Sequence, residues 1–145
     1  GIGNGGKISI NAMKLSLTDS SQIQSRVEAS NNTSISGGQG NAGDININVQ
    51  GDINFFKPRL GETNGIVSQV DAGTIGNGAN VTINAGSLSI LDGSEIQGST
   101  RGKGNSGNIT INAKDNILLD GTNGNTFSRI INSVQINGEG NAEDI

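Results

Sequence analysis

The chain has no cysteine and no histidine among its 145 residues. Without cysteine, neither a disulfide nor thiolate chemistry is possible, and cysteine usage says nothing about the cellular compartment. The lack of both residue types removes most of the nucleophile–base pairs that enzymes use. We therefore expect a protein that is not an enzyme, and we expect it to carry no cofactor.

Apolar residues are scarce, since hydrophobic residues make up 31% of the chain, which also contains 24 glycines. No apolar run approaches the roughly 20 residues of a membrane helix, so we expect no membrane-spanning segment. The formal charge is −4, and the basic residues are spread along the chain. Because nucleic acid binding needs a basic patch, we expect no nucleic-acid partner.

A Gly-Asn phrase followed by alternating isoleucines recurs along the chain. The first copy, residues 3–11, reads Gly-Asn-Gly-Gly-Lys-Ile-Ser-Ile-Asn, and later copies begin at residues 40, 76, 104 and 140. Such a period predicts a protein whose units stack in one dimension. The units are repeat 1 (residues 3–39), repeat 2 (40–75), repeat 3 (76–103) and repeat 4 (104–139). Because the copy at 140 is truncated, we expect residues 1–145 to be one segment of a longer repeat protein.

Repeat 3, the shortest unit, contains three short runs in which apolar and polar residues alternate. The runs are residues 80–85, 87–90 and 94–98, and glycine-containing corners separate them. Alternation with period two is typical of half-buried strands. Three strands and three corners match one triangular coil of a parallel β-helix.

The same apolar positions recur in every repeat, so stacked coils would place like side chains above one another. The first-strand pairs are Ile8/Ile10, Ile45/Ile47, Val81/Ile83 and Ile109/Ile111. The second-strand pairs are Leu15/Leu17, Ile53/Phe55, Leu88/Ile90 and Ile117/Leu119, and the third strand contributes Ile23, Ile66, Ile96 and Ile130. We predict an all-β fold: a single-stranded parallel β-helix of about four coils with side loops. Right-handed connections are the general rule for parallel strands.

Two repeats carry additional residues for which the stacked strands have no place, and such insertions form loops beside the strands. They span residues 57–64, which include the only proline, Pro58, and residues 122–127. In repeat 1 we expect extra residues around Val27 to Ile35. Asn11, Asn48, Asn84 and Asn112 each follow the first strand, and we predict that their side-chain amides stack as a ladder.

Three segments resemble the repeat region of filamentous-haemagglutinin-like exoproteins, particularly the large cyanobacterial ones. They are the Gly-Asn phrases at residues 40–47 and 104–113 and the segment at residues 88–96, which begins in the second strand. The resemblance covers essentially the whole chain and implies a right-handed parallel β-helix. It also implies export through the outer-membrane transporter of the two-partner secretion pathway. The family's amino-terminal secretion domain has no counterpart in these residues. A secreted or cell-surface location and a role in adhesion are what the resemblance implies.

Aspartates at the corners suggest one alternative, a row of carboxylates that binds Ca²⁺ or a glycan. Asp92-Gly93 and Asp120-Gly121 look equivalent, with Asp19 at the matching place in repeat 1. Calcium needs six to eight oxygens, and each corner offers one carboxylate. A turn-forming Asp-Gly is the interpretation we favour, and we expect no metal site.

Glycoside hydrolysis, a second alternative, needs two positioned carboxylates. Glu28, Glu62, Asp71 and Glu95 are available, but no pair is fixed by the sequence. We expect these charges to be solvated.

The two insertions give the candidate contact surface. Phe55 is in phase with the core, Phe56 points outward under the 57–64 loop, and Phe127 pins the second loop to the strands. The candidate surface residues are Phe56, Lys57, Arg59, Asn123, Asn125 and Phe127.

The predicted function is that of a structural and adhesive stalk segment that mediates cell or surface contact, with cell-surface glycans or proteins as partners. One alternative is a carbohydrate-active enzyme or glycan-binding module on the same fold. Another is a module that assembles end to end into a fibre, since open strand edges invite pairing.

Overall fold

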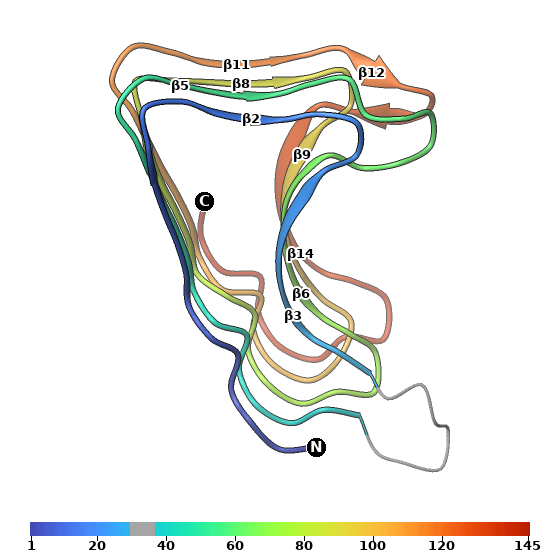
Figure 1. Cartoon of the computed structure of the whole chain (residues 1–145). Coiled ribbons are helices and arrows are strands. Elements are labelled where there is room, and N and C mark those ends of the chain that lie inside the picture. The colour runs from blue at the N-terminus through green and yellow to red at the C-terminus, as the bar shows by residue number, and fades with distance from the viewer. Residues whose placement is uncertain (30–36) are drawn as a thin grey trace.

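The computed structural model describes residues 1–29 and 37–145, and within these ranges every regular element is a β-strand. Twelve of the strands lie in three four-stranded parallel sheets, and two form a small antiparallel sheet. The chain visits the three sheets in a fixed order, and each repeat adds one strand to each sheet. Figure 1 shows the repeats stacked on one another, with the three sheets as separate sides.

The first sheet consists of β1 (Ile8–Ala12), β4 (Ile45–Val49), β7 (Val81–Ala85) and β10 (Ile109–Ala113), in that order. The second consists of β2 (Leu15–Leu17), β5 (Asp52–Phe55), β8 (Ser87–Leu91) and β11 (Ile117–Asp120). The third consists of β3 (Gln22–Val27), β6 (Gly65–Val70), β9 (Glu95–Thr100) and β14 (Arg129–Val134). The all-β, parallel-stranded part of the prediction is confirmed.

The register of each sheet places equivalent residues of successive repeats beside one another. In the first sheet Ile8 pairs with Ile45, Ile45 with Val81, and Val81 with Ile109. The second and third sheets align their predicted apolar pairs in the same way. Like side chains therefore stack along the inside, and the apolar positions read from the sequence are confirmed.

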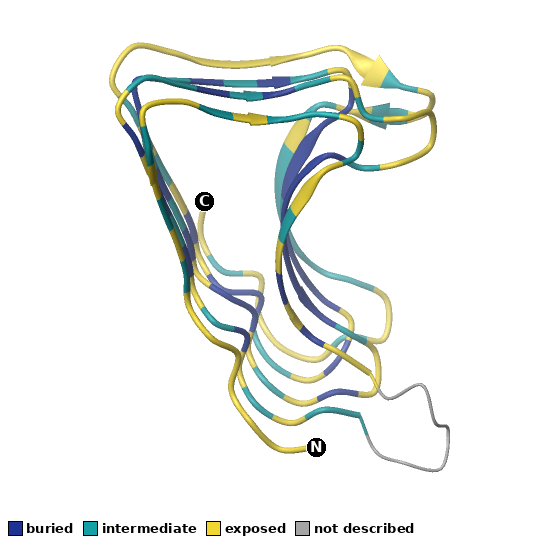
Figure 2. Cartoon of the chain, in the orientation of Figure 1, coloured by how far each residue is buried: buried dark blue, intermediate teal, exposed yellow. Residues whose placement is uncertain are grey.

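The core runs through the middle of the stack. Ile47, Phe55, Ile66 and Ile83 are each 0% exposed. In Figure 2 the buried segments gather in the inner repeats, whereas β11 is exposed along its length because it is the outermost strand of its sheet. Burial of the core is worth about 25 cal/mol per Å² of apolar surface, so the inner repeats carry most of that stabilisation.

The third sheet has a polar position in its interior that the sequence reasoning missed. Ser25, Ser68, Gly98 and Asn132 share this position. Ser25 donates from Oγ to the Gly43 carbonyl at 2.6 Å, and Asn132 donates from Nδ2 to the Gly107 carbonyl at 2.8 Å. The third strand is thus hydrogen-bonded across the interior to a Gly-Asn corner, that of the following repeat for Ser25 and that of its own repeat for Asn132.

The two predicted insertions leave the main sheets as expected. β6 resumes at Gly65 after residues 57–64, and residues 122–127 form a hairpin of β12 (Thr122–Asn123) and β13 (Thr126–Phe127). The expectation for repeat 1 was wrong at Val27, which belongs to β3 and pairs with Val70. Residues 30–35 of that expected insertion lie outside the described residues.

Candidate functional site

The insertions of repeats 2 and 4 contact one another and form a single surface, which we call the shelf (residues 57–64 and 121–128). The Asn123 side-chain amide donates to the Arg59 carbonyl at 2.7 Å and to the Glu62 carbonyl at 3.2 Å. In Figure 1 the two segments project on the same side of the molecule, beyond the ends of β5 and β11. The two insertions named as the candidate contact surface therefore lie against each other.

The shelf covers the short corner of repeat 3 that lies between the two insertions. Asp92 accepts the Lys57 backbone amide through Oδ2 at 3.2 Å, and the Gly93 amide donates to Ser128 Oγ at 3.0 Å. Gly93 has φ 80, and a Cβ there would lie 2.6 Å from the Asn123 backbone nitrogen. Glycine is therefore required at this corner for both conformation and space.

Asn64 anchors the inner end of the 57–64 loop. It is 0% exposed, and its Nδ2 donates to the Leu17 carbonyl at 2.7 Å and to the Phe56 carbonyl at 3.1 Å. A buried amide with two backbone partners fixes the path of a loop, because leaving those groups unpaired would cost free energy. The base of the shelf is accordingly well defined.

The six predicted contact residues all belong to the shelf or its margin, but they differ in exposure. Lys57, Arg59, Asn125 and Phe127 are exposed, whereas Phe56 and Asn123 are half-buried. Asn123 is occupied in joining the loops, so its amide stabilises the shelf. Leu60 is 83% exposed and was missed by the sequence reasoning, which looked for aromatic and polar residues.

The expectation that Phe127 pins its loop to the strands was wrong. Its side chain is 67% exposed, because the β12–β13 hairpin carries it away from the sheets. Phe55, by contrast, is in the core as predicted, with no exposed surface. The shelf therefore presents Leu60 and Phe127 to solvent together with the cations Lys57 and Arg59.

The equivalence of the Asp92-Gly93 and Asp120-Gly121 corners, on which the alternative of a carboxylate row depended, is wrong in its register. Asp120 pairs with Leu91, so the residue beside Asp92 is Gly121. Asp19, Lys57 and Asp92 adopt φ between 53 and 55, and Gly121 adopts φ 84. The corner thus selects a left-handed backbone at one position of each repeat, and Asp92 has the turn-forming role that we favoured.

Two of the four carboxylates considered for hydrolysis are held by arginines. Asp71 accepts Arg26 Nη2 at 2.9 Å, and Glu95 accepts Arg129 Nη2 at 2.7 Å. Glu62 is exposed on the shelf, and Glu28 is exposed beside β3. In residues 1–29 and 37–145 no three acidic side chains are grouped as ligands for a metal ion.

The predicted asparagine ladder is present on the outside of the first sheet. Asn48 donates to Asn11 at 3.2 Å, Asn84 to Asn48 at 2.8 Å and Asn112 to Asn84 at 2.9 Å, each from Nδ2 to Oδ1. The ladder lines a groove of about 720 Å³. Because each inner asparagine already has partners above and below, the groove offers few free polar groups, and the shelf remains the candidate contact surface.

A second ladder, which was not predicted, runs through the Gly-Asn corner. The side chain of Asn41 accepts the backbone amide of Asn77 at 2.9 Å, and Asn77 accepts that of Asn105 at 2.9 Å. Asn4 and Asn105 act in the same way in the first and last of these steps. The recurring Gly-Asn phrase is therefore explained by a side-chain acceptor that caps a backbone donor of the next repeat.

No protein-family model, curated protein or solved structure matches this chain. Among the described residues, none forms a helix with the length and apolarity to cross a membrane. What the chain does must therefore be argued from its repeats and its surfaces.

Proposed function

We propose that the chain is a right-handed parallel β-helix segment of about four coils that serves as a structural and adhesive stalk. Its parent would be a large secreted or cell-surface bacterial exoprotein similar to filamentous haemagglutinin. The observation that carries this proposal is the in-register stacking of all three sheets through four repeats. Each repeat contacts its neighbours along every side, which is the basis of a stiff rod.

The polar ladders support the mechanical part of the proposal. Two columns of asparagines add bonds parallel to the stack, one through side-chain amides and one through backbone amides. Backbone bonds between parallel strands run in the same direction. Force along the rod would load all of these bonds together.

The shelf supports the adhesive part. It departs from the regular stack, and its Leu60 and Phe127 are more than half exposed. Exposed apolar groups rimmed by polar ones are typical of interaction surfaces. We assign to it contact with cell-surface glycans or proteins, while export of the parent would use the outer-membrane transporter of the two-partner pathway.

Immunogold labelling tests the proposed location. Antibodies against this chain would be applied to whole, unpermeabilised cells of the bacterium that encodes it, and to its concentrated culture medium. Label on the cell surface or on released material is expected. Label that appears only after permeabilisation would overturn the proposal.

Adhesion of coated beads tests the contact role. Beads that carry the chain should adhere to cells or to a glycan array more than beads that carry a shelf variant, Leu60→Ser with Phe127→Ser. The matched control is Met13→Ser, which replaces an apolar side chain, 67% exposed, away from the shelf. Equal adhesion of chain and shelf variant would contradict the assignment.

A glycan-binding module or a carbohydrate-active enzyme is the second candidate, and the exposed ring of Phe127 beside Asn125 favours the binding form. A glycan array with the Phe127→Ser variant separates glycan contact from protein contact. End-to-end assembly is the third candidate. It predicts a concentration-dependent increase in size on gel filtration, whereas a stalk that contacts only other molecules predicts none.

A further inference from the structure

Repeat 3 is shorter than its neighbours at a second corner, the one between the third sheet and the next Gly-Asn phrase. Residues 71–75 and 135–139 cross this corner in repeats 2 and 4, but only residues 101–103 cross it in repeat 3. The longer crossings contain tight turns, closed by Thr74 N to Asp71 O at 3.2 Å and by Gly138 N to Gln135 O at 2.9 Å. Repeat 3 has no room for such a turn.

The shortened corner leaves a notch of about 260 Å³ in the side of the stack. Its lining includes Thr74 from repeat 2, Arg101, Gly102 and Lys103 from repeat 3, and Asn137 from repeat 4. Gly102 is buried, and a Cβ there would lie 2.5 Å from the Asp71 carbonyl oxygen. Glycine at this position lets the short crossing pack flat against repeat 2.

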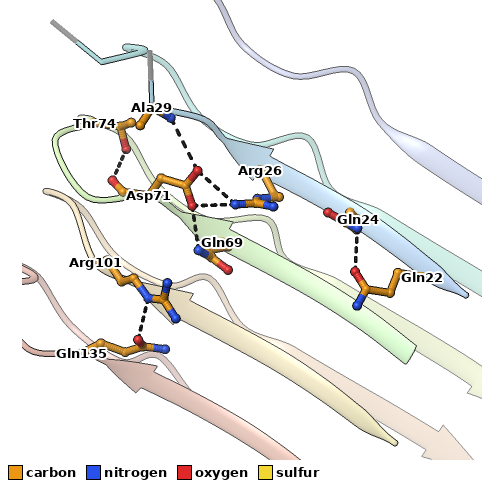
Figure 3. Close-up of polar contacts among 9 residues, drawn as sticks. All are labelled: Gln22, Gln24, Arg26, Ala29, Gln69, Asp71, Thr74, Arg101 and Gln135. Carbon is orange, nitrogen blue, oxygen red and sulfur yellow. Dashed lines mark hydrogen bonds and ion pairs between the residues drawn. The ribbon is translucent and has the colours of Figure 1, made fainter. Parts of the chain in front are cut away.

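The notch brings together two cations. Arg101 donates from Nε to the Gln135 side-chain oxygen at 2.6 Å, and in the described part of the chain neither of its terminal nitrogens has an acceptor. Figure 3 shows the guanidinium held by this bond over the strand ends, apart from the Asp71 carboxylate. Lys103 pairs with Glu139 at 3.2 Å, and both side chains are more than half exposed. Such exposed pairs contribute little free energy, so the Lys103 ammonium can turn to another anion.

The Asp71 carboxylate at this corner already has partners of its own. Asp71 accepts two bonds from Arg26 Nη2, at 2.9 and 3.0 Å, and one from Gln69 Nε2 at 2.6 Å. These bonds, drawn in Figure 3, direct Asp71 toward repeat 1. Among the described residues, Arg101 is consequently left with a guanidinium edge that no carboxylate uses.

We propose that this notch is a binding site for a single carboxylate, as carried by an acidic sugar, with Arg101 as the principal ligand and Lys103 as the second. A planar guanidinium whose two terminal nitrogens have no acceptor in the described residues matches the two oxygens of a carboxylate. The bond to Gln135 orients the group before binding, which lowers the entropic cost of holding it. The site is distinct from the shelf, so its failure would leave the stalk and the shelf unaffected.

An NMR titration with glucuronate tests the site, read on the Arg101 Nε–H signal and on the backbone amides of Gly102 and Lys103. These signals should shift with glucuronate and stay unchanged with glucose, which has the same ring without the carboxylate. Arg101→Gln should weaken the response about tenfold, the value of one charge-assisted contact. Lys114→Gln, which removes an exposed cation at the corner between the first and second sheets, should leave it unchanged.

Three outcomes would overturn the proposal. One is an undiminished response in an Arg101→Gln variant whose remaining spectrum is intact. Another is no shift at these signals at any soluble glucuronate concentration. The third is an equal response to inorganic sulfate, which would show that the notch collects any small oxyanion and has no preference for a carboxylate.

Discussion

The side-chain amide of Asn123 donates to the backbone carbonyl of Arg59 at 2.7 Å, although the two residues are 64 positions apart. The bond joins repeat 4 to repeat 2 across the intervening repeat. It is possible because repeat 3 has only a short Asp92–Gly93 corner at this place, so the two insertions meet above it. The shelf therefore depends on the length of a repeat that contributes nothing to its outer surface.

Removal of this bond should loosen the shelf without unfolding the stack. Asn123→Ala is expected to raise amide hydrogen exchange in residues 57–64 and to cost about 1 kcal/mol of stability, the usual net value of such a bond. Asn125→Ala is the matched control, since Asn125 is exposed and makes no side-chain hydrogen bond in the described part of the chain. Identical amide hydrogen exchange in the two variants would show that the Asn123 hydrogen bonds do not hold the loop.

The ladder asparagines should contribute more than chemically identical neighbours on the same strand. Asn48→Ala breaks bonds to both Asn11 and Asn84 and should cost about 1–2 kcal/mol. Asn46→Ala, on the same strand but without a side-chain bond in the described residues, should cost less than half as much. Urea denaturation of both variants measures the difference, and equal midpoints would contradict a stabilising ladder.

Gly76 should tolerate no side chain, because a Cβ there would collide with the Gly40 carbonyl of the preceding repeat. Its φ is also 150, in a region that glycine adopts readily and other residues avoid. We expect Gly76→Ala to prevent cooperative folding, as followed by circular dichroism during heating. Gly61→Ala is the control: φ is 77 but no atom lies within 4 Å of the added Cβ, so only about 1–2 kcal/mol of backbone strain is expected.

Glu95 should destabilise the folded state when its partner, Arg129, is removed. Its side chain is 4% exposed, and Arg129 reaches it through Nε and Nη2, both at 2.7 Å. Arg129→Gln leaves a buried carboxylate without its cation and should cost about 1–3 kcal/mol. The double variant Glu95→Gln with Arg129→Gln should recover most of that loss. A double variant no more stable than Arg129→Gln would show that the pairing itself is unimportant.

Much of the fold could be predicted because the informative signals are local and repeated. Apolar alternation at Ile45/Ile47 and Leu88/Ile90 identified the strands and their inner faces. Because these apolar pairs occupy the same positions in every repeat, they also indicated which residues of neighbouring strands pair. The asparagine ladder followed from the same phase, since Asn48 and Asn84 occupy one position of the repeat. The polar interior of the third sheet was missed because Ser25 and Ser68 resemble solvent-facing residues when their hydrogen-bond partners are unknown.

The candidate site could be predicted only in outline. The insertions were visible as extra length, but the hydrogen bonds that join them were not. That Phe127 is exposed and that Asn123 is occupied in holding the loops depends on the direction in which the β12–β13 hairpin leaves the sheets. The register error at Asp120 had a similar origin, because the path of a corner between strands is set by its packing on the neighbouring repeat.

By itself, the sequence determined the period, the strands and the side chains that face inward, because each of these is encoded within a few residues and repeated. Only the tertiary structure decided what happens where the period is broken. Repeat 3 is shorter than its neighbours, and the consequences appear at two corners: the shelf, where Asn123 joins repeat 4 to repeat 2, and the notch, where Arg101 of repeat 3 lies between them. Contacts between non-adjacent repeats depend on the height and length of the layer between them, which no local pattern of residues specifies.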